Sequence, residues 1–487
     1  MSRPAHRTPL RESTASRKGA GFIAPRHVVL SLMPRSTAFE SHGAQRYAAQ
    51  LLRALDQPAE RIDVADEHPA LRWSRSGLMA LTGTRAGAAL MCPAPIASCA
   101  DGALAALAAL APADALTGLR GSELLAERAA IAGHARQGAV SPGGSCRLLA
   151  TSDGAIALNL AREDDHALLP AWLEDERVAD DAALITAIQQ QTMHDLIERG
   201  RLLGLAVAPM VPTPTPATAW FTLTHASARA ARTSKPRHDA PRVLDLSSLW
   251  AGPLCTHLLQ RCGAEVVKVE SLQRPDGARR GPVQFFDLLN AGKRSVALDF
   301  SSAAGRAQLR TLIAASDIVI EASRPRALRQ LGIHAETLID EHPGLSWISL
   351  NGYGRNAEAE NWVAYGDDAG VAAGLSWLMR QASGETLIVG DAIADPLTGM
   401  HAALAAWACH RTGGGRLLSL SLVDVVRHVL QFDRAVGAEA IRARQQDWAQ
   451  FVRDEIPAPP RARAPRGSAP ALGADTDAVL REWTLTC

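Results

Sequence analysis

Two aspartates stand directly before an alanine-rich run in the second half of the sequence. The stretch GDAIADPLTGMHAALAAWACHRTGGG covers residues 390–415, with Asp391 and Asp395 in its first part. Asp is a preferred helix N-cap and Pro fits the first helical turn, so Asp395 and Pro396 predict where a helix begins. The same placement suits chemistry, because a carboxylate at the positive end of a helix would face the gap left by Gly399, where a substrate could enter. The stretch alone leaves both interpretations open.

Alternating strand and helix patterns surround these acids. Residues 242–248 (RVLDLSS) are typical of a buried strand, a helix follows from about Pro253 to Gly263, and residues 265–271 (EVVKVES) form the next strand. Further strand patterns lie at 294–300, 317–323 and 345–352. Strands that alternate with helices predict a doubly wound parallel sheet, whose ligands bind beyond the carboxyl ends of the strands. We therefore predict an α/β fold, with this sheet in a large domain at residues 241–430.

The first half of the sequence is less regular. Residues 25–135 combine an apolar strand pattern, HVVLSLM, with Ala/Leu-rich helices, and Asp101 precedes one of these helices much as Asp395 does. This similarity predicts that residues 25–135 are a degenerate copy of the large domain. Residues 145–164 predict a hairpin about a Ser-Asp-Gly turn, within a small α+β domain. The remaining predicted segments are a flexible tail at 1–24, the small domain at 136–212, a linker at 213–240, and a carboxyl-terminal linker with a tail helix at 431–487.

Composition excludes several classes of function. The 487 residues predict two or three domains, and 51 basic against 50 acidic residues leave a net charge of +1, too small to hold nucleic acid or a membrane surface. No apolar run reaches the roughly 18 residues of a membrane helix. The seven cysteines are scattered without a C-x-x-C pair, which argues against a metal site or a disulfide framework. We expect no bound metal and a reducing, cytoplasmic location.

Several motifs occur in the order known from one family. VLDLSSLWAGPLCTHLL, GAEVVKVES, NAGKRSVALDF, DIVIEASRPRALRQLGI, SLNGYG and ADPLTGMHAALAAWACHRTGGG together resemble the class III CoA-transferases, the CaiB/BaiF type. The tail LGADTDAVLREW resembles the family's carboxyl-terminal signature. The hairpin of the first half resembles the family's small second domain, which normally follows the large one. The chain thus resembles a fused, rearranged form with two family halves. That form implies either a monomer that mimics the family's interlocked dimer or a homodimer.

The resemblance implies a reaction and its nucleophile. In these transferases a carboxylate attacks an acyl-CoA thioester to give a mixed anhydride, the CoA thiolate returns to form an aspartyl-CoA thioester, and a carboxylic acid takes over the CoA. Asp395 matches that nucleophile, and no permanently bound cofactor is implied. An acyl-CoA racemase or isomerase and an inactive CoA-binding homologue stay open as alternatives. Tyr365 occupies the position of the racemase histidine, and a phenol with a pKa near 10 is a poor base, which favours transfer.

The resemblance also implies ligand contacts. Candidate CoA contacts are Leu249, Trp250, Ala251, Gly252 and Leu298, with Lys293, Arg294 and Arg324 for the phosphates. Candidate residues of the substrate pocket are Tyr365, Asp367, Asp368, Gly399 and His401. The sequence departs from the family at Ser271, where a basic residue often stands after the second strand. Asp101 lacks the following Pro and the later Gly-Met-His, so we expect one working site per chain.

Overall fold

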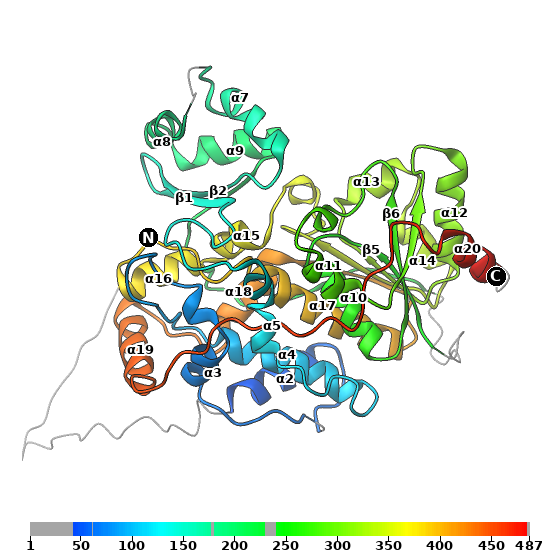
Figure 1. Cartoon of the computed structure of the whole chain (residues 1–487), viewed down its shortest axis with the longest axis horizontal. Helices are drawn as coiled ribbons and strands as arrows, with labels where there is room; N and C mark the ends of the chain where they lie inside the picture. Colours follow the sequence, from blue (N-terminus) through cyan, green and yellow to red (C-terminus); the bar gives the residue numbers. More distant parts are fainter. Residues whose placement is uncertain (1–41, 61, 177–179, 229–239, 485–487) are drawn as a thin grey trace, which may run out of the picture. The chain divides into compact units, whose positions relative to one another are not determined.

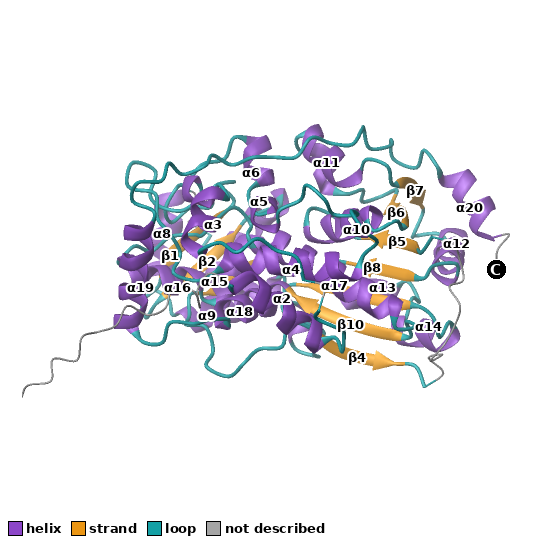
Figure 2. Ribbon diagram, turned by 90° about the horizontal axis from the view of Figure 1, so that it is seen from below, coloured by secondary structure: helices purple, strands orange, loops and turns teal. Residues whose placement is uncertain are grey.

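Seven strands form the larger sheet of the protein, in the order β4-β10-β9-β8-β5-β6-β7. The computed structural model describes residues 42–60, 62–176, 180–228 and 240–484. All neighbouring strands are parallel except β4 and β10, which run antiparallel (Figure 2). The strands are β4 (Thr222–Ala226), β5 (Arg242–Leu246), β6 (Glu265–Ser271), β7 (Arg294–Leu298), β8 (Ile318–Glu321), β9 (Ser346–Asn351) and β10 (Arg416–Ser421). The predicted α/β fold with a parallel sheet is confirmed.

The strand order reverses between β5 and β8. The chain runs outward from β5 to β6 and β7, then returns to β8 on the other side of β5 and continues to β9 and β10. The loops after β5 and β8 therefore leave the sheet in opposite directions and open a crevice at their carboxyl ends. This is the place where open α/β sheets bind ligands, and the segments at residues 247–252 and 322–324 line it by topology.

Helices cover both faces of the sheet. One face packs on α12 (Ala303–Ala314), α13 (Pro325–Gln330), α14 (Ala335–Glu341) and α20 (Thr476–Thr484). The other packs on α10 (Ala251–Arg261) and α17 (Ala394–Arg411), whose apolar side chains also join the helices of the first half. Further elements near the site are η3 (Gly277–Arg280), α11 (Val283–Asn290), η4 (Ala359–Asn361), α15 (Gly366–Ala373) and α16 (Leu375–Ser383). Because α10 and α17 pack directly on each other, the segments that precede them come together.

The predicted linker contributes an edge strand to the large sheet. Residues 222–226 form β4, which pairs antiparallel with β10, although the Pro- and Thr-rich context predicted little structure there. The linker prediction is therefore wrong for this segment. An edge strand needs only one paired neighbour, so a short polar sequence suffices to form it. Residues 229–239 of the predicted linker lie outside the described residues.

A smaller antiparallel sheet follows the first helices of the chain. Its strands are β1 (Cys146–Ala150), β2 (Ala155–Asn159) and β3 (Ala206–Pro209), in that order. Strands β1 and β2 join through residues 151–154, which confirms the predicted hairpin. η2 (Glu163–Leu168), α7 (Leu169–Leu173), α8 (Asp181–Gln189) and α9 (Met193–Leu203) accompany this sheet (Figure 1). Strand β3 contacts α15 and so ties the small sheet to the elements around the site.

The described part of residues 42–135 is helical. Its elements are α2 (Gly43–Ala54), α3 (Pro69–Arg75), η1 (Leu78–Ala80), α4 (Ile96–Leu110), α5 (Gly121–Leu124) and α6 (Glu127–Ala132). Asp101 lies in the middle of α4 rather than ahead of a helix, and its carboxylate pairs with Arg72 and accepts the Ser122 N–H. The prediction that Asp101 precedes a helix, as Asp395 was expected to do, is therefore wrong. The predicted tail 1–24 and the strand pattern at 27–33 lie outside the described residues.

The carboxyl-terminal region is more ordered than a linker. It contains α18 (Leu422–Gln431), α19 (Ala438–Phe451) and the predicted tail helix, α20. Residues 452–475, here called the strap, connect α19 to α20 as an extended segment (red in Figure 1). Its backbone bonds to Ser74 near one end and to Ser295 near the other. Among the described helices, none combines the length and apolar composition of a membrane span.

Candidate active site

Asp395 lies in the first turn of α17, next to the start of α10. The helix begins at Ala394, and Ile393 before it offers no side-chain cap, so the interpretation of Asp395 as an N-cap is wrong. The Asp395 carboxylate instead accepts the backbone N–H of Ala251, the first residue of α10. This contact joins two of the segments that the sequence singled out. A carboxylate that meets the free N–H groups of a helix end is electrostatically favoured there.

Gly366 closes the other side of this carboxylate. A Cβ at Gly366, the first residue of α15, would collide with Asp395 Oδ2 and with the Ala392 carbonyl oxygen. The start of α15 can approach the acid this closely only because the residue is glycine. Asp395 stays partly exposed, although the protein around it removes enough water from its carboxyl group to affect its pKa.

Burial dominates the acidity of Asp395. Removal of the carboxyl group from water raises its pKa to about 7. The charge of Arg128 and the Ala251 hydrogen bond oppose this increase, whereas the charges of Asp367 and Asp391 add to it. The helix end therefore does not keep Asp395 fully ionised. Near neutral pH the residue exchanges between a neutral acid and a nucleophilic carboxylate.

The adjacent acids Asp367 and Asp368 point to different partners. Asp367 Oδ1 accepts the Ala392 N–H at 2.7 Å, and burial raises the pKa of this acid to about 6. Asp368 Oδ1 accepts the Asn159 side chain at 2.8 Å and the Tyr365 N–H at 3.0 Å. Burial raises the pKa of Asp368 to about 7, and its Oδ2 has no hydrogen-bond partner among the described residues. Only Asp367 faces the Asp395 segment.

Two residues of the first half that lie at the site were not predicted from the sequence. Arg128 of α6 binds Asp391 through two hydrogen bonds, from Nε at 2.8 Å and from Nη2 at 2.6 Å. The His134 ring nitrogen Nδ1 lies 3.3 Å from the same carboxylate. The Arg128 guanidinium also lies 5.5 Å from the centre of the Trp250 ring, so it contacts both the acid segment and the loop after β5. No local pattern distinguished this arginine from a surface charge.

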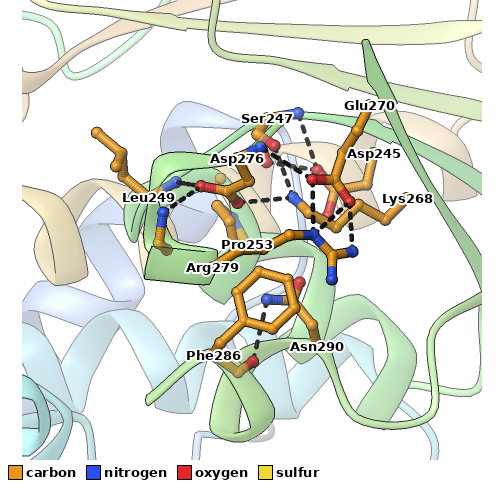
Figure 3. A network of polar contacts seen from close by, with 12 residues as sticks. Asp245, Ser247, Leu249, Pro253, Lys268, Glu270, Asp276, Arg279, Phe286 and Asn290 are labelled. Atoms are coloured by element: carbon orange, nitrogen blue, oxygen red, sulfur yellow. Dashed lines mark hydrogen bonds and ion pairs between the residues drawn. The ribbon is translucent and has the colours of Figure 1, made fainter. Parts of the chain in front are cut away.

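A buried polar network fixes the loop after β5, residues 247–252 (Figure 3). Lys268 Nζ donates to the Ser247 carbonyl oxygen at 2.8 Å and pairs with Asp276 at 3.0 Å. Asp276 Oδ1 in turn accepts the Leu249 N–H at 3.0 Å. Leu249 adopts a φ of 67°, which is costly for a residue with a side chain, and it is 42% exposed. The network thus holds a strained turn and presents one apolar side chain outward.

The other residues of this loop differ in accessibility. Trp250 is buried, with its ring edge-on to Phe285. A Cβ at Gly252 would collide with the Ser247 side chain, so the glycine serves the tight turn into α10. The predicted CoA contacts at Leu249 and Ala251 fit this geometry best, because one side chain is exposed and the other residue holds Asp395.

Three predicted CoA contacts are occupied by internal partners. Lys293 is buried, and its Nζ donates to Asp245, Thr256, Asn290 and the Pro253 carbonyl oxygen, so the prediction that it meets a phosphate conflicts with its place. Arg294 stands at the amino end of β7 and pairs with Glu265 and Glu482, away from the carboxyl edge of the sheet. Leu298 is buried in the core beneath α12.

A basic cavity lies at the carboxyl ends of β6 and β8. Its volume is about 160 Å³, and its lining includes Arg162, Arg274 and Arg324. Burial and the neighbouring arginines lower the pKa of Arg324, as expected where like charges converge. Arg274 follows Ser271 by three residues and supplies a positive charge near the place where the family's basic residue is missing. Asp164 and Asp165 line the same cavity, and Asp165 pairs with Arg162. The charges that suit an anionic group are therefore those of Arg274 and the predicted Arg324.

The remaining predicted pocket residues have mixed roles. Burial raises the pKa of Tyr365, so even less of the phenol is ionised to the phenolate that could accept a proton at neutral pH. A Cβ at Gly399 would lie 2.7 Å from the Ala251 carbonyl oxygen, so this glycine admits α10 rather than a substrate. His401 is a core residue bonded to Tyr47 and to the Leu397 carbonyl oxygen, and burial lowers its pKa to about 3. Both pocket interpretations are therefore wrong.

No group of three or more His, Cys, Asp or Glu side chains that could hold a metal ion occurs among the described residues. The six cysteines within the described ranges are free and buried. The polar chemistry of the site therefore comes from Asp395 and its neighbouring acids, Arg128, His134 and the basic cavity.

Comparison with known proteins finds a family match for one segment of the chain. Residues 239–451 match the family model of CoA-transferase family III. The chain is 30% identical over 219 residues to an acyl-CoA transferase of Fusarium pseudograminearum, covering 41% of the chain and 48% of the relative. It is 32% identical over 202 residues to a formyl-CoA:oxalate CoA-transferase of Rhodopseudomonas palustris, covering 39% and 47%. The chain thus spans about half the length of these relatives.

A solved structure shares sequence with a similar part of the chain. The crystal structure of a CaiB/BaiF family protein from Brucella suis is 27% identical, with a TM-score of 0.36, over 47% of this chain and 60% of that one. The described residues before 239, which include Arg128, His134 and the small sheet, lie outside the segment that the family model matches.

Proposed function

We propose that the protein transfers CoA from an acyl-CoA thioester to a carboxylic acid, with Asp395 as nucleophile. The observation that carries this proposal is the contact between the Asp395 carboxylate and the first N–H of α10, directly after the loop at residues 247–252. A partly exposed acid next to the loop at the topological switch point is placed where a thioester bound in the crevice would present its carbonyl carbon.

Each step of the proposed reaction uses the same carboxylate. An ionised Asp395 oxygen attacks the thioester carbonyl, the carbon–sulfur bond breaks, and CoA leaves as a thiolate with the electron pair. The thiolate then attacks the aspartyl carbonyl of the mixed anhydride and releases the first acid as its carboxylate. The acceptor carboxylate attacks the aspartyl-CoA thioester, which forms a second mixed anhydride and expels the CoA thiolate. The thiolate then attacks the carbonyl carbon of the acceptor, and the anhydride carbon–oxygen bond breaks to regenerate the Asp395 carboxylate. Arg274 and Arg324 of the basic cavity would bind phosphate groups of CoA.

A racemase or isomerase is less well supported. Such an enzyme must move the α-proton of its substrate, and the phenol of Tyr365, with its raised pKa, is a poor proton acceptor at neutral pH. An inactive CoA-binding homologue stays the other alternative, because Lys293, Arg294 and Leu298 are not available to a ligand. The unpaired buried cysteines fit our inference of a reducing, cytoplasmic location.

Covalent trapping tests the proposal. The full chain is mixed with a panel of short-chain, branched and dicarboxylic acyl-CoA thioesters, treated with hydroxylamine, and digested for peptide mass analysis. We expect a hydroxamate on the peptide that contains Asp395 and none in Asp395→Asn. Release of the α-deuterium from a 2-methylacyl-CoA without an acceptor acid would instead favour the isomerase. Binding of CoA without modification of Asp395 by any thioester of the panel would favour the inactive homologue.

A further inference from the structure

The turn that carries Asp395 is strained and must be fixed by its surroundings. Ala392 adopts a φ of 46°, in the left-handed region that is costly for a residue with a side chain. Such a conformation persists only where neighbouring contacts determine it. Two side chains that approach this turn, Arg128 and His134, come from outside residues 239–451.

Hydrogen bonds reach the turn from two sides. Asp391 is fully buried and accepts both Arg128 hydrogen bonds, with His134 against the same carboxylate. The next residue, Ala392, donates its N–H to Asp367. The Ala392 carbonyl oxygen then accepts the Asp395 N–H at 2.9 Å. A continuous set of contacts therefore runs from Arg128 to the backbone of Asp395.

The charges around Asp395 are unbalanced without Arg128. Asp367 from α15 and Asp391 from the turn both face this region, and Asp368 lies in the same turn of α15 but binds Asn159. Arg128 of α6 and the His134 ring lie on the other side and contact Asp391. The charge of Arg128 lowers the pKa of both Asp367 and Asp395, which burial has raised. Removal of this cation would favour the protonated, unreactive form of Asp395.

We propose that Arg128 is a positioning residue for Asp395, which it orients through Asp391 and whose ionised form its charge favours. His134 supports the same carboxylate. The amino-terminal part of the chain would then complete the active site of the family segment. This inference rests on the proposed role of Asp395 as nucleophile.

The test compares the pH dependence of covalent trapping at Asp395 in the full-length protein, with a thioester that modifies the wild type. In Arg128→Met we expect a slower reaction and a midpoint shifted upward by about one pH unit or more. In Asp391→Asn we expect the opposite shift, because one negative charge is lost while Arg128 remains. The matched control is Arg147→Met, which removes an arginine whose ion pair with Asp181 is exposed, and it should leave the midpoint unchanged.

The outcomes separate this inference from the proposed function. If wild-type Asp395 is modified by no thioester, the proposed function fails first. If the wild type reacts while folded Arg128→Met and Asp391→Asn keep its midpoint, or shift it in the same direction, the role of Arg128 is refuted. Should Arg128→Met fail to fold, Arg128→Lys retains the charge without the paired geometry. That variant should keep the midpoint and react more slowly, and an equal rate would count against the positioning role.

Discussion

At the scale of single residues, the acids of the site differ in what they cost the fold. Asp391 has a lowered pKa because His134 and Arg128 outweigh its burial, whereas Asp367, Asp368 and Asp395 have raised values for want of enough opposing charge. An acid with a raised pKa stabilises the fold while it is protonated. That contribution is lost as the pH rises through the folded pKa, here about 6 to 7.

Asp368→Asn tests this cost directly. Asparagine keeps the oxygen that accepts the Asn159 and Tyr365 hydrogen bonds and carries no charge to bury. Below about pH 4, where Asp368 is protonated in both the folded and the unfolded chain, the variant should be nearly neutral. Its gain in the free energy of unfolding, measured by urea titration, should grow by on the order of 2 kcal/mol between about pH 5 and about pH 8. An equal effect at the two pH values would contradict the assignment of a raised pKa to this acid.

Gly366→Ala should separate reactivity from folding. The added methyl would collide with Asp395 Oδ2 and the Ala392 carbonyl oxygen, so the carboxylate must move. A displacement of about 1 Å can cost on the order of 100-fold in rate, and we expect a loss of that size in covalent trapping at Asp395. The control is Gly344→Ala, where no atom lies within 4 Å of the new Cβ. Unchanged trapping in Gly366→Ala would show that the acid is not held by this contact.

Predictability from sequence also differs between residues. Asp395 and the loop at 247–252 could be predicted as candidates because their helix pattern and neighbouring motifs are local. Arg128 could not be found, since its role depends on a partner 263 residues away. Lys293 was misplaced because a charged side chain near a strand suggests the surface, whereas here it neutralises the buried Asp245. The burial of a charged side chain can be predicted only when its partner is known.

At the scale of elements, the crossing of α10 and α17 sets the geometry of the site. The strand and helix patterns predicted both elements, yet not their contact, because Gly399 was interpreted as an opening for substrate. The glycine instead lets the helices approach until the Ala251 carbonyl oxygen lies against it. The same approach brings the Ala251 N–H to Asp395. The strands of the large sheet were predicted more reliably than this contact, because buried parallel strands appear in a sequence as short apolar runs.

Gly399→Ala should therefore affect stability and reactivity together. Its Cβ would lie 2.7 Å from the Ala251 carbonyl oxygen and 3.2 Å from Leu254 Cβ, which forces the helices apart. We expect a loss of about 1–3 kcal/mol in the free energy of unfolding. Covalent trapping should also slow, because Ala251 moves away from Asp395. A destabilised variant with wild-type trapping would show that the Ala251 contact does not matter for the reaction.

At the scale of the whole described molecule, the strap joins the two halves of the chain. Arg463 of the strap pairs with Glu127 through Nε at 2.5 Å and Nη2 at 2.9 Å, and Glu127 precedes Arg128 in α6. The Glu127 side chain is only 1% exposed, so its charge depends on this partner. The strap therefore stabilises the helix that supplies Arg128. The sequences of the two segments, taken separately, did not predict this contact.

Arg463→Met tests the strap. It leaves the buried Glu127 without its paired cation and should cost about 3 kcal/mol in the free energy of unfolding. Limited proteolysis within residues 456–470 should become faster as the strap loosens. The matched control, Arg453→Met, removes an arginine whose pair with Asp454 is exposed, and it should change stability by less than about 1 kcal/mol. Equal stability of the two variants would mean that the strap does not fasten α6.

The pairing of Glu127 also bears on the order in which the protein is completed during synthesis. Its partner lies 336 residues later, so this whole stretch must be synthesised before the acid is neutralised. Until then the Glu127 carboxylate of α6 lacks its paired cation. Growing chains can fold in part as they emerge, but this helix would settle only after Arg463 has left the ribosome. The candidate site around Asp395 would therefore be completed only after the strap has been made.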